Sequence, residues 1–75
     1  MQRIGSSNIL KVAYDKQSRT MQIVFINRPN WLYTYYDMNI QRYTAFLKAQ
    51  SKGEYFTRHI KENYKFKKEI HTKHI

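Results

Sequence analysis

Hydrophobic and polar residues alternate along the first half of the chain, a pattern typical of β-strands with one buried face. The alternation predicts strands over 9–15 and 20–26, joined by the short polar connection 15–19, and a third strand over 31–36. The segment 27–30 contains a proline, which interrupts a strand ladder, and it predicts the second turn. Because both connections are short, the economical topology is an antiparallel meander.

The third predicted strand, Trp31-Leu32-Tyr33-Thr34-Tyr35-Tyr36, is the most aromatic stretch of the chain. Alternate strand positions point to the same face, so Tyr33 and Tyr35 lie side by side with Trp31 next to them. If helices cover that face, the rings belong to the core; if it is open, they can stack on nucleic-acid bases. The core interpretation is favoured, with Leu32, Thr34 and Tyr36 facing outward, and the stacking interpretation stays open.

After Asp37 the period of the apolar residues changes from two to about 3.6, which predicts a helix. Asp37 or Asn39 can cap its start, and its apolar stripe runs through Ile40, Tyr43 and Leu47.

The stretch Ser51-Lys52-Gly53-Glu54 predicts the end of this helix and the start of another. Gly53 suits the left-handed position after a helix, and Ser51 with Glu54 matches a capping box. The predicted fold is therefore α+β: a three-stranded antiparallel meander followed by two helices packed on one face. Around a single domain over 8–66 we expect a flexible lead-in over 1–7 and a basic tail over 67–75. The apolar face of the second helix contains Tyr55, Phe56, His59, Ile60 and Tyr64.

Charge adds a functional expectation to this fold. The 75 residues carry a formal net charge of +9, and the segment 42–75 contains nine basic residues against three acidic ones. Such an excess attracts polyanions, and aromatic residues are interleaved with it. We expect RNA or single-stranded nucleic acid as the partner, bound without sequence specificity; a solvated surface that keeps the protein soluble is the plainer interpretation. The candidate nucleic-acid-binding residues are Arg42, Lys48, Lys52, Arg58, Lys61, Lys65, Lys67, Lys68 and Lys73, with Tyr33 and Tyr35 as a second choice.

An alternative function is a protein–protein adaptor or inhibitor that docks on an acidic host protein, because aromatic and arginine side chains also dominate protein interfaces. Catalysis is not expected: the chain is small, and no nucleophile–base pattern or glycine-rich phosphate loop is present. His71 and His74 are too few ligands for a structural zinc site, so we expect neither metal nor cofactor. With no cysteine, signal peptide or membrane span, the expected location is the cytoplasm.

A set of short motifs follows in order along the chain: Ser6-Ser7-Asn8-Ile9, Tyr14-Asp15, the alternation of Met21, Ile23 and Phe25, the central Tyr33-Thr34-Tyr35, Asp37, and Ala49-Gln50-Ser51-Lys52-Gly53-Glu54-Tyr55-Phe56 followed by Ile60 and Tyr64. With this set the sequence resembles the KTSC family, a short bacterial and phage-borne module that is appended to some lysyl-tRNA synthetases. The resemblance implies the fold described above and a proposed role in RNA binding. Two positions depart from the family pattern: Asn39 replaces a usual proline, and Thr57 replaces a usual asparagine.

Overall fold

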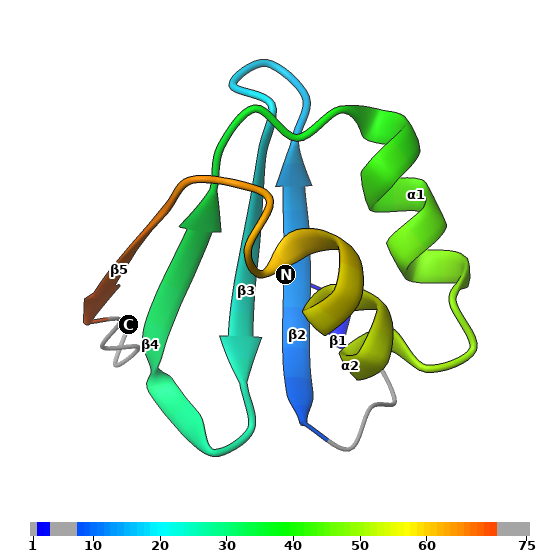
Figure 1. Cartoon of the computed structure of the whole chain (residues 1–75). Helices are drawn as coiled ribbons and strands as arrows, with labels where there is room; N and C mark the ends of the chain where they lie inside the picture. The colour runs from blue at the N-terminus through cyan, green and yellow to red at the C-terminus, as the bar shows by residue number, and fades with distance from the viewer. Residues whose placement is uncertain (1, 4–7, 71–75) are drawn as a thin grey trace.

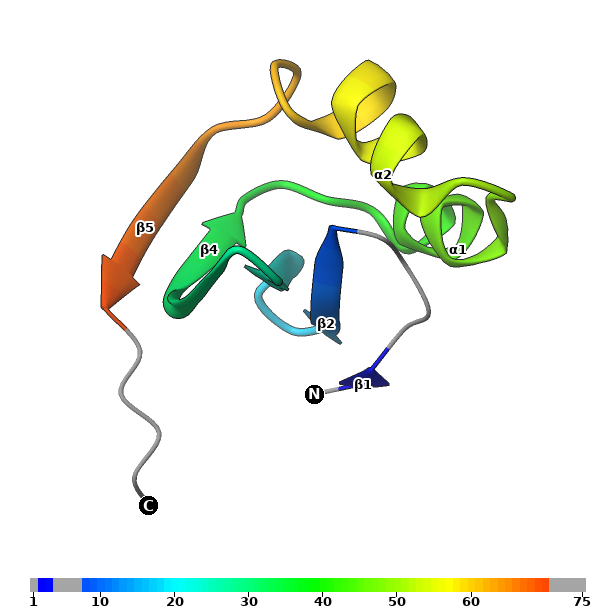
Figure 2. The same ribbon diagram turned by 90° about the horizontal axis from the view of Figure 1, so that it is seen from below.

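The computed structural model describes residues 2–3 and 8–70 and shows an antiparallel sheet with two helices on one of its faces (Figures 1 and 2). None of the helices in these ranges is long and apolar enough to cross a membrane. The elements in chain order are β1 (Gln2–Arg3), β2 (Ile9–Asp15), β3 (Thr20–Phe25), β4 (Arg28–Tyr35), α1 (Ile40–Lys48), α2 (Lys52–Tyr55), a π-helical turn (Phe56–Ile60) and β5 (Phe66–Ile70).

The sheet has the strand order β1-β2-β3-β4-β5, and each strand pairs antiparallel with its neighbours. The α+β class and the two helices on one face are confirmed, whereas the expectation of only three strands is wrong. The segment predicted as a basic tail, 67–75, contributes most of β5, and its residues 71–75 lie outside the described part of the chain. Within the predicted lead-in 1–7, residues 2–3 form β1 and the others are likewise not described.

Polar side chains and backbone geometry close the two hairpins. Asp15 ends β2, and its Oδ1 accepts a hydrogen bond from the Gln17 amide at 3.0 Å, an Asx-type turn. Arg19 adopts φ 56° just before β3 begins. The second turn is tighter than predicted, because β4 already begins at Arg28, whose Cα partner is Phe25.

The core lies between the helices and one face of the sheet. The register pairs Tyr14 with Met21 and Ile23 with Tyr33, so these side chains point toward the helices. On this face α1 contributes Phe46, which is fully buried. The cluster of buried residues is Ile9, Val12, Met21, Ile23, Tyr35, Met38, Tyr43, Phe46, Phe56 and Ile60.

Helix α1 begins at a side-chain cap. Asn39 Oδ1 accepts a hydrogen bond from the Arg42 amide at 2.8 Å, so Asn39 rather than Asp37 is the capping residue. Asp37 instead adopts φ 57° in the connection from β4. The buried side of α1 is centred on Tyr43, and Ile40, predicted on the buried stripe, is 42% exposed.

The second helix starts as predicted but then changes its period. Ser51 Oγ accepts a hydrogen bond from the Glu54 amide at 3.3 Å, which caps α2. The prediction for Gly53 is wrong: it lies inside α2 without a positive φ. Downstream, the Lys61 amide donates to the Phe56 carbonyl at 2.8 Å, a hydrogen bond across five residues that defines a π-helical turn.

Candidate functional site

Tyr33 and Tyr35, the central tyrosines of β4, lie on the face of the sheet that the helices cover. Tyr35 is 3% exposed and belongs to the core, and Tyr33 is half-buried and packs against it. Leu32 and Thr34 point to the opposite face, as expected for alternate positions, but they too are buried. The two tyrosines are thus packing residues, and the edges of their rings also border an open groove.

Aromatic side chains from three different regions of the chain meet around these tyrosines. Phe25 of β3 contacts Tyr33 edge-to-face, with ring centroids 5.3 Å apart. Phe56 makes similar edge contacts with Phe25 at 5.3 Å and with Tyr35 at 5.5 Å. Phe66 of β5 stacks on Tyr35 at 5.1 Å. Edge-to-face and offset-stacked geometries are the favoured arrangements of aromatic pairs, so the five rings form one coherent wall.

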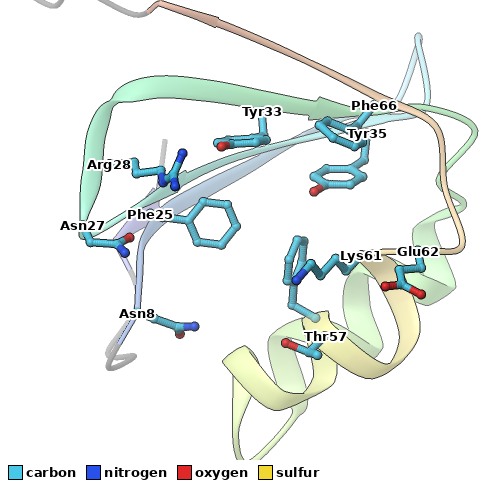
Figure 3. Close-up of a pocket in the computed structure, with 11 residues that line it drawn as sticks. Asn8, Phe25, Asn27, Arg28, Tyr33, Tyr35, Thr57, Lys61, Glu62 and Phe66 are labelled. Carbon is cyan, nitrogen blue, oxygen red and sulfur yellow. The ribbon is translucent and has the colours of Figure 1, made fainter.

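This wall lines a groove of about 510 Å³ between the sheet and the end of the second helix (Figure 3). We call it the aromatic groove. Its lining is mainly apolar, with polar groups around the rim, which is the usual composition of a ligand site. The lining residues are Asn8, Phe25, Asn27, Arg28, Tyr33, Tyr35, Phe56, Thr57, Lys61, Glu62 and Phe66.

Two cationic side chains reach the rim of the aromatic groove from different elements. Arg28 comes from the start of β4 and lies beside Tyr33, whereas Lys61 comes from the helical side (Figure 3). The π-helical turn explains the position of Lys61. Its hydrogen bond joins residues five apart instead of four, and this brings Lys61 close to the side of the helix that carries Phe56. Among the described lining residues, Glu62 is the only acidic one, and the rim is therefore net positive.

The hydroxyls of Tyr33 and Tyr35 give the aromatic groove a hydrogen-bonding edge. Burial, helped by the neighbouring Tyr33, raises the pKa of Tyr35 from 10.0 to about 12. Within the described ranges, neither hydroxyl takes part in a hydrogen bond, and no buried side-chain polar atom lacks a partner. The hydroxyls are therefore accessible from the groove, and that of Tyr35 stays protonated at neutral pH.

Arg42, the first of the predicted nucleic-acid contacts, forms hydrogen bonds within the chain. Its Nη1 donates to the Tyr55 hydroxyl at 2.9 Å and its Nε to the Tyr64 hydroxyl at 3.3 Å. These two hydrogen bonds raise the pKa of Arg42. The side chain thus connects α1 to the second helix and to the connection that follows it.

Three more of the predicted cations already have partners inside the chain. Arg58 forms an exposed ion pair with Glu54 at 3.2 Å. Lys67 lies 3.8 Å from Glu69, and Lys52 Nζ donates to the Ala49 carbonyl at 3.3 Å. Exposed ion pairs are worth only about 0–1 kcal/mol, so polyanions could compete for Arg58 and Lys67, but neither borders the aromatic groove.

The remaining predicted cations are dispersed over the surface. Lys48 at the end of α1 and Lys65 before β5 are exposed. Lys68 Nζ lies 5.2 Å from the centroid of the Trp31 ring, on the groove side of the sheet. Of the predicted cations that the structure describes, only Lys61 lines the groove. Lys73 lies outside the described residues.

Several groove residues were not singled out as a site from sequence. Arg28 lies in the segment 27–30 that the sequence predicts as a turn, Phe25 lies in the predicted strand 20–26, and Phe56 lies on the apolar face of the second predicted helix. No local pattern could have joined Phe56 to the other two, because β4 and α1 lie between them in the chain. Thr57, which departs from the KTSC pattern, lines the groove and donates through Oγ1 to the Gly53 carbonyl at 3.0 Å.

The histidines show no sign of metal chemistry in the described ranges. No three potential ligands among His, Cys, Asp and Glu gather there. His59 is exposed, and its ring lies 4.5 Å from that of Tyr55. The spaced pair His71 and His74 lies outside the described residues.

Comparison with known proteins points to one family. A family model described as the KTSC domain matches residues 5–64. The chain is also similar to the crystal structure of a KTSC domain protein from Yersinia pestis. The two sequences are 32% identical, the match covers 91% of this chain and 93% of the Yersinia pestis chain, and the TM-score is 0.83. A search of curated proteins found no match.

Proposed function

The chain belongs to the KTSC domain family, and we propose that it is a non-enzymatic accessory module that binds single-stranded nucleic acid, preferentially RNA. The aromatic groove would hold one unstacked base, and the flanking cations would contact the phosphates. The observation that carries this proposal is a groove walled by five aromatic rings, with Arg28 and Lys61 at its rim.

The size and chemistry of the groove suit a single base. A volume of about 510 Å³ lies within the range of about 300–1,000 Å³ that is typical of small-ligand sites. Single-stranded nucleic acid is commonly held on aromatic side chains, each stacked base contributing about 1–3 kcal/mol. On the sheet side of the wall, Tyr33 is half-buried and Phe66 is exposed, and their ring centroids are 5.9 Å apart.

The two rim cations provide different kinds of phosphate contact. The planar guanidinium of Arg28 can bind a phosphate with two parallel hydrogen bonds, whereas Lys61 acts as a point charge. Because the Tyr35 hydroxyl is neutral, it can donate to a base edge or to the 2′-hydroxyl of ribose. A 2′-hydroxyl contact is the chemistry that distinguishes RNA from DNA, and it motivates the preference for RNA.

Fluorescence anisotropy with a labelled single-stranded RNA tests the proposal. At about 50 mM salt we expect measurable binding, weakening steeply toward 200 mM. Tyr33→Ala should weaken binding by about 5- to 150-fold, the equivalent of one stacked base. Lys61→Gln should weaken it and reduce the salt slope by about 1. A labelled DNA of the same sequence measures the preference for RNA.

Lys16→Gln is the matched control, since Lys16 is an exposed lysine in the β2–β3 turn and does not line the groove. It removes the same charge and should leave the affinity nearly unchanged. Equal effects of the two lysine variants would show that only overall charge matters. Absence of binding at about 50 mM salt, where electrostatic binding is favoured, would refute nucleic-acid binding altogether.

A further inference from the structure

In the described part of the chain, strand β5 leaves one side of its backbone free for another strand. It lies at the end of the sheet order and pairs, among the described residues, with β4 alone (Figure 1). All five of its side chains are exposed. An uncovered strand edge offers unpaired N–H and C=O groups, and extended peptides bind such edges by adding a strand.

The register shows which backbone groups of β5 point outward. The Tyr36 amide donates to the Lys65 carbonyl at 2.9 Å, which makes this pair a hydrogen-bonded one. Hydrogen-bonded and non-hydrogen-bonded pairs alternate along an antiparallel ladder. Lys67 and Glu69 therefore direct their backbone groups toward β4. The backbone groups that point to the free edge are those of Phe66, Lys68 and Ile70.

The side chains of the same three residues form an alternating surface. They share the face of their partners Tyr35, Tyr33 and Trp31 in β4. Phe66 is 48% exposed and Ile70 is 66% exposed, two of the few large apolar side chains at the surface of the described residues. Lys68 stands between them. The free edge thus presents an apolar–basic–apolar series at every second residue.

We propose that this edge binds an extended peptide that carries an acidic residue flanked, two positions away on each side, by apolar residues. The acidic side chain would lie opposite Lys68, and the apolar ones would lie beside Phe66 and Ile70. Charge complementarity selects this partner. Lys67 already has Glu69 nearby on the other face, whereas within the described ranges Lys68 has no carboxylate partner and contacts the Trp31 ring.

A second copy of the chain is a poor occupant of the edge. Full antiparallel pairing of two β5 strands places Lys68 directly opposite its own copy, and like charges in that position are destabilising. Lysine on an edge strand is a common means of preventing such self-association. The positive charge of Lys68 favours a partner of opposite charge. The edge of β5 should therefore pair with an acidic peptide in preference to a second β5 strand.

Heteronuclear NMR titration with a short peptide, Thr-Val-Thr-Glu-Thr-Val-Thr, tests this proposal. We expect saturable shifts of the Phe66, Lys68 and Ile70 amides. Lys68→Glu should weaken binding about tenfold, since an attractive cross-strand pair becomes a repulsive one. A peptide with lysine in place of glutamate should bind this variant better than the original chain. Lys67→Glu, the same charge change on the opposite face, should have less than about a threefold effect.

Backbone methylation of the peptide provides an independent criterion. In the proposed pairing the amide of the glutamate faces β5, and that of the next threonine faces away. Methylation of the first should abolish binding, whereas methylation of the second should be tolerated. Equal effects of the two, absence of binding, or a peptide-free dimer through β5 would overturn the proposal.

The peptide site and the nucleic-acid site can be separated. Arg28→Gln should weaken RNA binding and leave peptide binding unchanged, because Arg28 lines the groove and not the free edge. If Lys68→Glu weakens RNA binding and the acidic peptide does not bind, the edge belongs to a nucleic-acid surface and the peptide proposal is wrong. If RNA fails to bind and the peptide binds, only the proposed function is refuted.

Discussion

Gly53 lets helix α2 approach the start of β2 closely, and its replacement by alanine should reveal how tight that approach is. An added Cβ would lie 2.5 Å from Asn8 Oδ1 and 3.1 Å from both Cγ and Nδ2. Because Oδ1 and Nδ2 are both this close, exchanging their positions does not remove the clash, and the whole Asn8 side chain has to move. The Asn8 backbone is also held, since its carbonyl accepts from the Ile26 amide at 3.0 Å.

Two opposing effects decide whether Gly53→Ala raises or lowers the free energy of unfolding. Alanine in a helix is favoured over glycine by about 1 kcal/mol. Overpacking typically costs about 1–3 kcal/mol. We therefore expect Gly53→Ala to lower the free energy of unfolding by about 1 kcal/mol, equivalent to a fall in Tm of about 4–8 °C for a domain of this size.

Thermal unfolding followed by circular dichroism, on four proteins, measures this effect. In the Asn8→Ala background the clash is absent, so the same Gly53→Ala change should stabilise the protein by up to about 1 kcal/mol. The double-mutant cycle should give a coupling energy of about 1–3 kcal/mol. A stabilising effect of Gly53→Ala alone, or additivity within about 0.5 kcal/mol, would show that the close approach does not constrain the helix.

Two further predictions concern polar groups near the core. Arg42→Gln should lower the free energy of unfolding by about 1 kcal/mol, because the half-exposed side chain loses its charged hydrogen bonds to Tyr55 and Tyr64. Chemical denaturation measures this change. An unchanged denaturation midpoint would contradict a structural role of Arg42. Burial raises the pKa of Tyr35 to about 12 in the folded protein. The contribution of Tyr35 to the free energy of unfolding is therefore fully present below about pH 10 and is lost as the pH rises toward 12. The free energy of unfolding should fall by at most about 1.4 kcal/mol per pH unit over this range. Tyr35→Phe should reduce that loss in alkaline unfolding curves, and identical curves for both proteins would contradict it.

Most of the sheet and both helix starts could be predicted from local patterns. Alternation identified the strands, and the caps at Asn39 and Ser51 follow from side chains that accept hydrogen bonds from backbone amides. These signals are local, so a single sequence carries them. The sequence predicts Gly53 at the end of a helix, whereas in the structure it lies inside α2 and allows a close approach to Asn8. That approach depends on tertiary packing, so no local pattern indicates it.

Strand β5 could not be recognised because its spacing is ambiguous. Phe66 and Ile70 are four residues apart, and residues with that separation share one face of either a helix or a strand. The lysines between them have low β propensity, which further hid the strand. Pairing with β4 decides the conformation, and that interaction connects segments on either side of both helices.

The aromatic groove was missed for a related reason. Its residues lie just before β2, at the end of β3 and in the turn after it, in β4, in and after the π-helical turn, and in β5. Only the folded chain brings these segments together. The sequence identified Tyr33 and Tyr35 but could not show that they are both packing residues and groove residues. Charge identified the basic half of the chain, yet Arg28, from the other half, is the arginine at the rim.

The pairing of β5 with β4 also has a consequence for the order of folding. β2, β3 and β4 pair through short turns, whereas β5 closes its ladder only after the chain has passed through both helices. Contacts between distant segments carry the larger loop-closure cost and form late. We therefore expect Phe66 to reach Tyr35 in one of the last folding steps. A chain that ends before β5 lacks Phe66, and with it both the complete groove and the peptide edge. Both proposed binding activities thus arise only when the C-terminal strand has been made and has joined the sheet.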